Sequence, residues 1–478
     1  MEKFYITTSI PYVNGPPHIG FALEIIQADV LARFNRRKGS AVFFLTGTDE
    51  HGLKIAKSAK DAGVSPREFT DSISGKFRDL AKKLDISNDD FIRTTDAIRH
   101  WPAVQTVWKQ LKEHSDLEKR SYEGLYCAGC EAFMAEKDLA EGLCPIHKKA
   151  PEPVKEENWF FLLSKYGPAL KEKLESGELR IVPESRKNEI LELIKQGLQD
   201  VSFSRPKEKL QWGIPVPDDD TQVVYVWADA LTNYISALGY PSGEKFKEYW
   251  PASVHAVGKD ILRFHATIWP AMLLSLGLPL PKIIFVHGFI TVEGQKMSKS
   301  LGNVIDPFSL IEKYGADAVR YFFLREVPAA EDGDFSFERF EQRYNADLAS
   351  GLGNLVARVL KMGDMAFGET LPVPAGFSDK QFQSVADEAR KGIDGALDNF
   401  QFGSALEKIW EVMRFCDKYI DEKKPWEQKD GSREVIGDLL FAIHELADFL
   451  EPFLPGAARK ITIQLAGRDR AALFPRAV

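Results

Sequence analysis

Apolar and polar residues alternate in blocks along the first fifty positions of the chain. Residues 4–8 are aromatic and β-branched, which is typical of a strand, and a loop rich in proline and glycine follows over 11–17. Apolar residues at spacings of three and four then predict a helix that starts near His18 and that Gly39 ends. A second apolar run over 41–45 predicts the next strand. This order of strand, helix and strand begins a parallel α/β sheet, which binds ligands beyond the carboxyl ends of its strands.

The pattern changes twice farther along the chain. From about residue 116 to about 220 the sequence is charged and rich in loops, and the strand–helix pattern resumes at 223–226 and again at 283–286. Beyond about residue 345 only helical periodicity remains, which predicts a helical bundle. The predicted fold class is therefore α/β, with a doubly wound parallel sheet of Rossmann type that is split by an insertion and followed by an all-α bundle.

Size and charge narrow the classes of function. The 478 residues are 44% hydrophobic and 28% charged, which is ordinary for a globular protein, and the length predicts about three domains. The formal net charge of −8 argues against a protein that coats nucleic acid through a broad basic field, although a local basic face stays possible. The N-terminus has no leader of charged and then apolar residues, and proline, lysine and histidine interrupt the most apolar stretch, 268–289. We therefore expect a cytoplasmic protein without a membrane span.

The string Pro17-His18-Ile19-Gly20 lies where the predicted loop meets the predicted helix. A helix N-terminus presents unpaired N–H groups and a partial positive charge, which suit a phosphate. His18 can donate to a phosphate oxygen, and Gly20 lets a ligand approach the backbone closely. Taken alone the motif is weak, because an incidental helix start explains it more simply.

The string Lys296-Met297-Ser298-Lys299-Ser300 is far more specific. Gly294 precedes it and Gly302 follows it, so its two lysines lie in a loop that can move. Such a loop can neutralise the charge that builds on a triphosphate when pyrophosphate leaves. A solvated basic turn is the alternative.

Together the two strings resemble the signature motifs of class I aminoacyl-tRNA synthetases, written HIGH and KMSKS, in their order and in their separation by an insertion. The second motif is complete, whereas Phe21 stands where the first normally has another histidine. Phenylalanine cannot donate a hydrogen bond, and losing one such donor costs about 2–4 kcal/mol of transition-state stabilisation. The resemblance implies that His18, Lys296 and Lys299 are catalytic and that Mg²⁺ accompanies ATP. It also implies an ATP-binding set made of His18, Gly20, Gly258, Asp260, Lys296, Ser298 and Lys299.

Three of the four cysteines lie in one short, charged segment. Cys127 and Cys130 form one pair at a spacing of three, and Cys144 and His147 form a second pair. Thiolate and imidazole pairs at this spacing can wrap a tetrahedral Zn²⁺, and because all four positions are filled, a structural zinc is favoured over a catalytic one and over unligated thiols. Such clustering also indicates a reducing compartment. Cys416 lies in an apolar helical stripe and is expected in the core.

Trp227, Ala230, Leu231 and Tyr234 are spaced so that they share one face of a helix. An aromatic stripe of this kind is more often core than pocket, yet aromatic contacts near sulfur also suit a flexible thioether such as that of methionine. Asp49, in the loop after the second strand, can pair with the ammonium group of an amino acid. A carboxylate on the loop surface explains Asp49 more simply.

Five features resemble the methionyl branch of class I: residues 10–15, 47–52, 225–227 and 258–261, and the zinc-ligand pairs. The matches run from residue 4 to about residue 426. Arg205 matches the arginine that pairs with the counterpart of Asp49 in this branch. A lone histidine on a helix is usually structural, but the resemblance implies that His265 belongs to the methionine pocket. The implied pocket consists of Ile10, Tyr12, Asp49, Trp227, Ala230, Tyr234, Ile261 and His265, with Arg205 beside it.

Three residues of the predicted bundle are candidates for contact with RNA. Asn354 and Arg358 are four apart on one helix, and Trp426 follows a short basic segment. A tryptophan can stack on an unstacked base while asparagine and arginine read base edges, although Trp426 is equally well explained as a cap on the core. The family reads the CAU anticodon with the matching positions, so the resemblance implies an anticodon site here.

The resemblance implies two in-line steps. The methionine carboxylate attacks the α-phosphate of ATP to give methionyl-adenylate, and the terminal ribose hydroxyl of tRNA(Met) then attacks the carbonyl. Methionine, ATP and tRNA(Met) are the expected partners, and a monomer is expected because no appended module follows the bundle. The expected boundaries are 1–115 and 223–290 for the two halves of the catalytic sheet, 116–222 for the insertion with its zinc knuckle, 291–345 for the KMSKS loop and stem-contact region, and 346–478 for the anticodon-binding bundle.

Two alternatives remain at this point. The first is a class I synthetase for another amino acid, such as leucine or valine, although such relatives usually carry a larger editing insertion than the stretch of about a hundred residues here. The second is a noncatalytic paralogue that binds tRNA or another RNA, to which Phe21 points. A measurement of methionine-dependent exchange of pyrophosphate into ATP separates these two alternatives from a methionine-specific synthetase.

Overall fold

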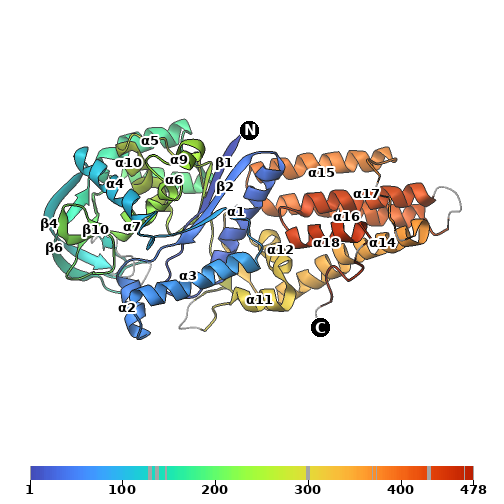
Figure 1. The fold of residues 1–478 in the computed structure, drawn as a ribbon, viewed down its shortest axis with the longest axis horizontal. Coiled ribbons are helices and arrows are strands. Elements are labelled where there is room, and N and C mark those ends of the chain that lie inside the picture. The colour runs from blue at the N-terminus through green and yellow to red at the C-terminus, as the bar shows by residue number, and fades with distance from the viewer. Residues whose placement is uncertain are drawn as a thin grey trace. The chain divides into compact units, whose positions relative to one another are not determined.

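The computed structural model describes residues 2–127, 132–134, 139–145, 148–297, 302–368, 370–372, 374–427, 432–467 and 469–476. Two compact units are found, each assembled from three stretches of chain (Figure 1). The first unit consists of Met1–Pro16, Gly39–Asp79 and Asn88–Val286, and the second of Pro17–Lys38, Leu80–Ser87 and His287–Val478. Among the described residues, every helix is too short or too polar to cross a lipid bilayer.

The first unit is built on a six-stranded sheet with the order β3-β2-β1-β12-β13-β7. Its strands are β1 (Lys3–Thr8), β2 (Ala41–Thr48), β3 (Asp90–Arg93), β7 (Arg180–Val182), β12 (Val254–Gly258) and β13 (Ile283–His287). The central strand β1 pairs in parallel with β2 on one side and with β12 on the other. The strand order reverses between β1 and β12, and Rossmann-like sheets bind ligands at this switch point. The predicted parallel α/β sheet is confirmed.

The segment expected as an insertion contributes a strand to this sheet. β7 pairs in parallel with β13 at the edge of the sheet. Conversely β11 (Asp219–Val224), expected as the strand where the parallel sheet resumes, lies in an antiparallel sheet with β9 (Ser204–Pro206) and β10 (Pro215–Val216). The reason is that central parallel strands are buried on both faces. β12 is buried at all of its residues, whereas the polar first half of β11 is largely exposed.

A second antiparallel sheet, of order β5-β4-β6-β8, fills most of the charged segment. Its strands are β4 (Leu117–Cys127), β5 (Ala132–Met134), β6 (Glu152–Phe161) and β8 (Val201–Ser202). Its long pair, β4 and β6, runs from Leu117 opposite Phe161 to Tyr126 opposite Glu152. Leu117 and Phe161 belong to the same buried cluster as Tyr5 of β1, so the inserted sheet shares one core with the parallel sheet.

Helices surround these sheets in the first unit. They are α2 (Leu53–Asp61), α3 (Pro66–Lys83), which continues into the second unit, α4 (Trp101–Glu113), α5 (Gly167–Ser176), α6 (Glu184–Lys195), α7 (Val226–Leu231), α8 (Asn233–Ser236), α9 (Glu244–Tyr249) and α10 (Trp269–Ser275). A 3-10 helix covers Leu163–Tyr166, and a π-helix, Phe264–Ile268, leads into α10.

The second unit contains a small sheet, the predicted first helix and the helical bundle. The sheet has the order β15-β14-β16, with β14 (Ile290–Val292), β15 (Gln295–Lys296) and β16 (Gly333–Phe335). The helices are α1 (Ile19–Arg37), α11 (Pro307–Tyr314), α12 (Ala316–Glu326), α13 (Phe337–Arg343), a π-helix (Tyr344–Gly353), α14 (Asn354–Phe367), α15 (Lys380–Asp398), α16 (Phe402–Lys423), α17 (Ser432–Leu450) and α18 (Pro455–Leu465). In the bundle α14, α16 and α17 pack against one another, α15 against α16 and α18 against α17 (Figure 1), which confirms the predicted all-α region.

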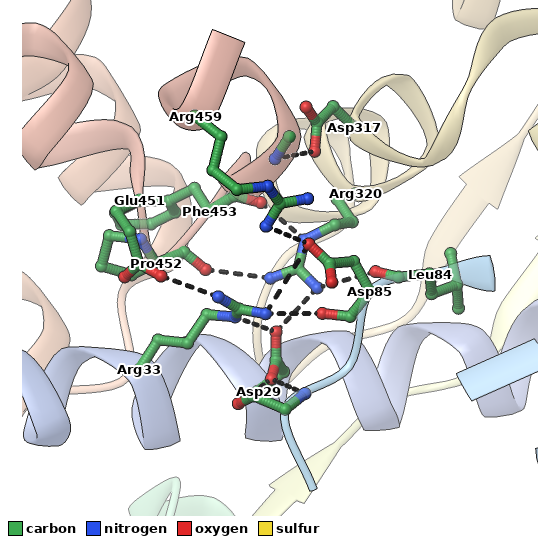
Figure 2. A network of polar contacts seen from close by, with 12 residues as sticks. Asp29, Arg33, Leu84, Asp85, Asp317, Arg320, Glu451, Pro452, Phe453 and Arg459 are labelled. Atoms are coloured by element: carbon green, nitrogen blue, oxygen red, sulfur yellow. Dashed lines mark hydrogen bonds and ion pairs between the residues drawn. The ribbon is translucent and has the colours of Figure 1, made fainter. Parts of the chain in front are cut away.

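Buried ion pairs join α1 to α12 and to the end of α17 within this unit (Figure 2). The Asp29 carboxylate accepts from Arg320 at 2.7 Å and from Arg33 at 2.8 Å. Arg320 is fully buried, and its guanidinium also donates to three backbone oxygens, those of Leu84 at 3.2 Å, Pro452 at 2.9 Å and Phe453 at 2.7 Å. A buried charge requires such complete pairing, so this network fixes α1 relative to α12 and α17.

Candidate functional site

Backbone hydrogen bonds join the loops that follow β1 and β2. The Asp49 N–H donates to the Pro11 oxygen at 3.0 Å, and the Val13 N–H donates to the Asp49 oxygen at 3.1 Å. Tyr12 and Asp49 thereby form an isolated parallel bridge. Because β1 lies beside the switch point of the sheet, this bridge places both residues at the carboxyl ends of the strands. The structure thus brings together two residues predicted from separate loops.

An aromatic cluster involves α7 and the π-helix that follows β12. Trp227 of α7 stacks on Phe264, with ring centroids 3.9 Å apart and planes inclined by 7°. Trp227 also meets the ring of His265 edge to face at 6.0 Å. The Tyr234 hydroxyl of α8 lies 2.7 Å from His265 Nε2. Three predicted residues are therefore in one cluster, and Phe264 is a member that the sequence did not reveal.

His265 is held as a neutral imidazole. Its Nδ1 lies 3.0 Å from the Ile261 carbonyl oxygen, which can only accept, so Nδ1 carries the proton and Nε2 accepts from the Tyr234 hydroxyl. Burial lowers the pKa of His265 to about 4. The ring therefore stays uncharged at pH 7. An uncharged aromatic surface suits a thioether and disfavours a charged side chain.

The predicted pocket residues divide into two layers. The buried members are Asp49, Ala230, Tyr234 and His265, so the alternative of a surface carboxylate at Asp49 is wrong. The members that keep some exposure while packing against the core are Ile10, Tyr12, Trp227 and Ile261. The partly exposed group supplies a surface that a ligand can contact, and the buried group supports it. If the aromatic stripe belonged only to the core, Trp227 would be fully buried, but its side chain is partly exposed.

Arg205 lies in β9 with its side chain buried. Its Nη1 donates to the backbone oxygens of Ser202 at 3.1 Å and Ser204 at 2.7 Å. Its guanidinium lies 4.4 Å from the ring centroid of Tyr225, the residue that precedes α7. These contacts fix Arg205 beside the start of α7, and its pairing with Asp49 stays a prediction.

Gly258 and Asp260 lie where β12 ends. Gly258 is the last residue of the strand and is buried, and Asp260 follows in an exposed position. The Ile261 N–H donates to the Gly258 oxygen at 3.2 Å, which closes a tight turn. Both residues therefore lie at the carboxyl end of the strand adjacent to β1, as expected for a ligand-binding turn of such a sheet.

In the second unit, His18 is the N-cap of α1. Its Nδ1 accepts from the Gly20 N–H at 3.0 Å, so a neutral ring carries its proton on Nε2. The side chain is exposed. An N–H donor on an imidazole at a helix N-terminus has the geometry and charge that bind phosphate.

The position of the His18 imidazole leaves room only for glycine at position 20. A Cβ at Gly20 would lie 2.8 Å from His18 Cε1 and 3.0 Å from His18 Nδ1. We expect Gly20→Ala to displace the imidazole. If His18 donates to a phosphate, as the resemblance implies, adenylate formation should then fall by about tenfold or more. The control is Gly75→Ala in α3, where a Cβ meets no atom within 4 Å and helix propensity improves. Unchanged exchange of pyrophosphate in Gly20→Ala would contradict the role given to the cap.

Phe21 is also in the first turn of α1. Its side chain is only 7% exposed, and its N–H donates to the His18 oxygen at 3.1 Å. The aromatic ring is therefore part of the protein interior. Burial of an apolar ring is the physical role that the structure gives to this departure from the family motif.

Lys296 lies exposed in β15, opposite Thr291 of β14. The hairpin turn contains Glu293 and Gly294, whose φ angles of 51° and 75° are left-handed. The Asn303 side-chain amide donates to the Lys296 oxygen at 3.2 Å, which ties together the two sides of the motif. Ser298 and Lys299 lie outside the described residues.

The predicted anticodon residues lie in the bundle. Asn354 begins α14 and is exposed, and Arg358 pairs with Asp417 at 3.0 Å and with Asp421 at 3.6 Å. Trp426 follows α16 and is 60% exposed, so the alternative of a cap on the core is wrong. An exposed indole is available for stacking.

Two of the four predicted zinc ligands can be described. Cys127 ends β4 and is buried, and Cys144 is buried within a mostly exposed segment. The Lys148 N–H donates to the Cys144 oxygen at 2.8 Å, and the Cys144 N–H donates to the Lys149 oxygen at 2.9 Å. Cys130 and His147 lie outside the described residues, and no cluster of three or more metal-ligating side chains occurs in the part that the structure describes.

Known proteins resemble this chain along nearly all of its length. Residues 4–150 and 135–360 match the family model described as tRNA synthetases class I (M), and 379–472 match the anticodon-binding domain of tRNA ligase. A methionine–tRNA ligase of Caldanaerobacter subterraneus subsp. tengcongensis is 47% identical over 97% of this chain and 74% of its own. One of Brucella suis is 44% identical over 97% of this chain and 92% of its own.

A solved structure leads to the same family. The Mycobacterium tuberculosis methionyl-tRNA synthetase in complex with methionyl-adenylate has a TM-score of 0.93 and 37% identity, with all of both chains covered. These relatives support neither a synthetase for another amino acid nor a noncatalytic paralogue. With close to half of its residues identical to those of methionine–tRNA ligases over almost its whole length, the chain belongs to the methionyl-tRNA synthetases of class I.

Proposed function

We propose that the chain joins methionine to tRNA(Met) in two steps, with methionyl-adenylate as the intermediate, and that the residues predicted from its motifs bind the substrates. The observation that carries the methionine assignment is the uncharged aromatic cluster of Trp227, Tyr234 and His265, in the same unit as the bridged pair Tyr12 and Asp49. No side-chain nucleophile is needed, because both steps depend on positioning and on electrostatic stabilisation.

The two ends of methionine require different chemistry. Asp49 is a carboxylate that can accept from the substrate ammonium group. The thioether would lie against the aromatic rings and Ile261, where each contact of sulfur with a ring contributes about 0.3–1.5 kcal/mol. Ile10, Ala230 and Arg205 complete the proposed set. The neutral state of His265 supports this assignment, because the pKa of about 4 keeps a charge out of the pocket.

The ATP end depends on cationic and backbone groups. We assign the phosphate donor to His18 Nε2 and close approach of the nucleotide to Gly20, Gly258 and Asp260. Lys296, Ser298 and Lys299 are assigned to the triphosphate, where lysine charge stabilises departing pyrophosphate together with the Mg²⁺ that accompanies ATP. Lys299→Ala should then reduce adenylate formation far more than methionine binding, and equal losses in both would contradict its assignment.

A panel of amino acids tests the proposal as a whole. Methionine should drive exchange of pyrophosphate into ATP, while the other nineteen protein amino acids, leucine and valine included, should drive far less. A preference for another amino acid, or binding of tRNA without any exchange, would overturn the assignment. The Phe21→His variant is measured in the same exchange assay. Little change in kcat would mean that the second imidazole of the motif is dispensable here.

We assign anticodon recognition to Asn354, Arg358 and Trp426. Stacking of a base on an aromatic side chain contributes about 1–3 kcal/mol, so Trp426→Ala should raise the KM for tRNA(Met) by about 5- to 150-fold while leaving exchange without tRNA unchanged. Arg358 is ion-paired with Asp417 in the described structure, and RNA would have to compete for it. Trp159→Phe, at a partly buried tryptophan of the inserted sheet, is the control for nonspecific effects. An unaltered KM in Trp426→Ala would remove Trp426 from the site.

We further propose that Cys127, Cys130, Cys144 and His147 hold one structural zinc ion. Burial of Cys127 and of Cys144, the latter in a segment that is otherwise largely exposed, supports this, because thiolate ligands are typical of structural zinc sites. A zinc ion held by these four residues would crosslink residues 127–147 and take no part in the reaction.

Elemental analysis tests the zinc assignment. The purified chain should contain about one zinc per molecule, and Cys127→Ser or Cys144→Ser should lose it. The matched control is Cys416→Ser, since Cys416 is buried in α16 and should leave the zinc content unchanged. Full zinc content in Cys144→Ser would rule out the predicted ligand set.

A monomeric state and a cytoplasmic location also stay proposals. Light scattering after size-exclusion chromatography tests the first, and a molar mass twice that of the 53.8 kDa chain would contradict it. Fractionation of cells tests the second.

A further inference from the structure

A buried carboxylate between two imidazoles lies beside the proposed methionine site. Asp229 is fully buried, with Oδ2 2.7 Å from His51 Nδ1 and Oδ1 2.7 Å from His100 Nε2. The second nitrogen of His100, Nδ1, lies 2.7 Å from the Ser236 hydroxyl. A carboxylate only accepts, so each imidazole presents an N–H to Asp229. The Ser236 hydroxyl, which also donates to the Asn233 backbone oxygen at 3.3 Å, holds the far side of the His100 ring.

Three of the four members of this hydrogen-bond network lie within two positions of a proposed methionine residue, and the fourth, His100, precedes α4. His51 is two positions after Asp49 in the loop that follows β2. Asp229 lies in α7 between Trp227 and Ala230. Ser236 ends α8, two positions after Tyr234. These hydrogen bonds therefore link the loop proposed to bind the ammonium group with the helices proposed to bind the thioether.

Moving these residues apart would be energetically costly, because Asp229 is a buried charge. Burial alone would raise the pKa of Asp229, but His51 and His100 together lower it below its usual value. A buried ionised carboxylate needs partners on both oxygens, and moving either histidine away would leave it uncompensated. His51 is also enclosed by the rings of Trp101 and Trp212, with centroids 5.9 and 5.4 Å away. The Trp212 indole N–H donates to the Glu50 oxygen at 2.5 Å, which fixes the same loop.

We propose that Asp229 is a positioning residue for methionine recognition, because its bonds to His51 and His100 set the separation between Asp49 and the helices that carry Trp227, Ala230 and Tyr234. The inference rests on the proposed function and deepens it. Asp229 acts through its neighbours and need not touch the substrate.

The test is the division of kinetic effects between methionine and ATP. Asp229→Asn keeps the shape of the side chain, but its amide group faces an N–H donor, so one of the two bonds is lost. A hydrogen bond to a charged group contributes about 1.5–3 kcal/mol, so the KM for methionine in pyrophosphate exchange should rise by about 10- to 150-fold. The KM for ATP and kcat should stay within about twofold of the wild type.

A matched control separates positioning from stability. Asp438 of α17 is equally inaccessible, and its carboxylate accepts from the N–H groups of Ser378 at 2.6 Å and Asp379 at 3.2 Å. Asp438→Asn should lower Tm without raising the KM for methionine. Ser236→Ala removes only the outer bond to His100 and provides a milder variant, with a smaller rise in that KM, if Asp229→Asn does not fold.

The outcomes are distinct. A wild-type chain that shows no methionine-dependent exchange refutes the proposed function itself. An active wild type whose Asp229→Asn and Ser236→Ala variants keep the KM for methionine within twofold refutes only the inference. A fall in kcat at unchanged KM also refutes it, because that pattern would assign Asp229 to the chemical step.

Discussion

His18→Asn is expected to lower kcat for methionine-dependent pyrophosphate exchange by about 10²- to 10³-fold. The neutral ring of His18 accepts from the Gly20 N–H through Nδ1, so its Nε2 carries the hydrogen that can bond to a phosphate oxygen. Removing one donor that stabilises the transition state has a cost of about 2.7–4 kcal/mol. The KM for methionine should change little, since His18 is assigned to ATP. Steady-state exchange at saturating methionine measures the effect.

Asparagine is chosen because it is among the best N-cap residues. It can accept from the helix N–H groups as His18 does, whereas alanine removes the cap and destabilises the helix by about 0.5–2 kcal/mol. His18→Asn should therefore keep the wild-type Tm, and His18→Ala should lose both activity and stability. If the asparagine variant kept full kcat, the imidazole would serve the helix alone.

Arg320→Ala is expected to lower the free energy of unfolding by about 3–5 kcal/mol and the Tm by on the order of 10 °C. The fully buried guanidinium compensates Asp29 at 2.7 Å and satisfies the backbone oxygens of Leu84, Pro452 and Phe453 (Figure 2). Alanine leaves a buried carboxylate with one guanidinium fewer and three carbonyl groups short of a donor. Differential scanning calorimetry of the transition that includes the second unit measures the loss.

An exposed arginine is the control for this variant. Arg339 is half exposed and lies 3.9 Å from Glu326, so Arg339→Ala should cost no more than about 1 kcal/mol. A loss below that value in Arg320→Ala would mean that the network relaxes around the substitution.

The acid side of the stability profile gives a second check on the same variant. Burial would raise the pKa of Asp29, but Arg320 and Arg33 lower it below its usual value. Stability from this pairing is therefore present above the ordinary aspartate pKa of about 3.9 and is lost as the pH falls through the lower folded-state value. Without Arg320 the carboxyl takes up its proton at higher pH. The difference in stability between wild type and Arg320→Ala should thus shrink below about pH 4.

Local features of the site were predictable where one short segment contains the whole signal. The strand, the loop and the cap at His18 are consecutive in the chain, and apolar spacing places the helix after them. The motif at Lys296 is likewise a single string. In contrast, a histidine in place of Phe21 would satisfy the family motif, and only the structure reveals that the phenylalanine ring is buried.

Other features depend on which strands become neighbours. The bridge of Tyr12 with Asp49 exists because β1 and β2 are paired, and the placement of β7 at the sheet edge contradicts any division of the chain by composition alone. The exposure of Trp426 is another case, since an indole after a helix reads equally as core or surface.

The amino-acid sequence by itself determined the α/β class, the helical bundle and the two motifs, whereas the residues proposed for methionine were implied by the resemblance to class I synthetases. Periodicity and strings of adjacent residues encode these features, because they depend on contacts within a few positions. Only the tertiary structure decided that Asp229 is paired with His51 and His100, and that Arg320 compensates Asp29, across separations of more than a hundred residues. The physical reason is burial: a charge becomes costly, and its partners become specific, only after distant segments have packed around it.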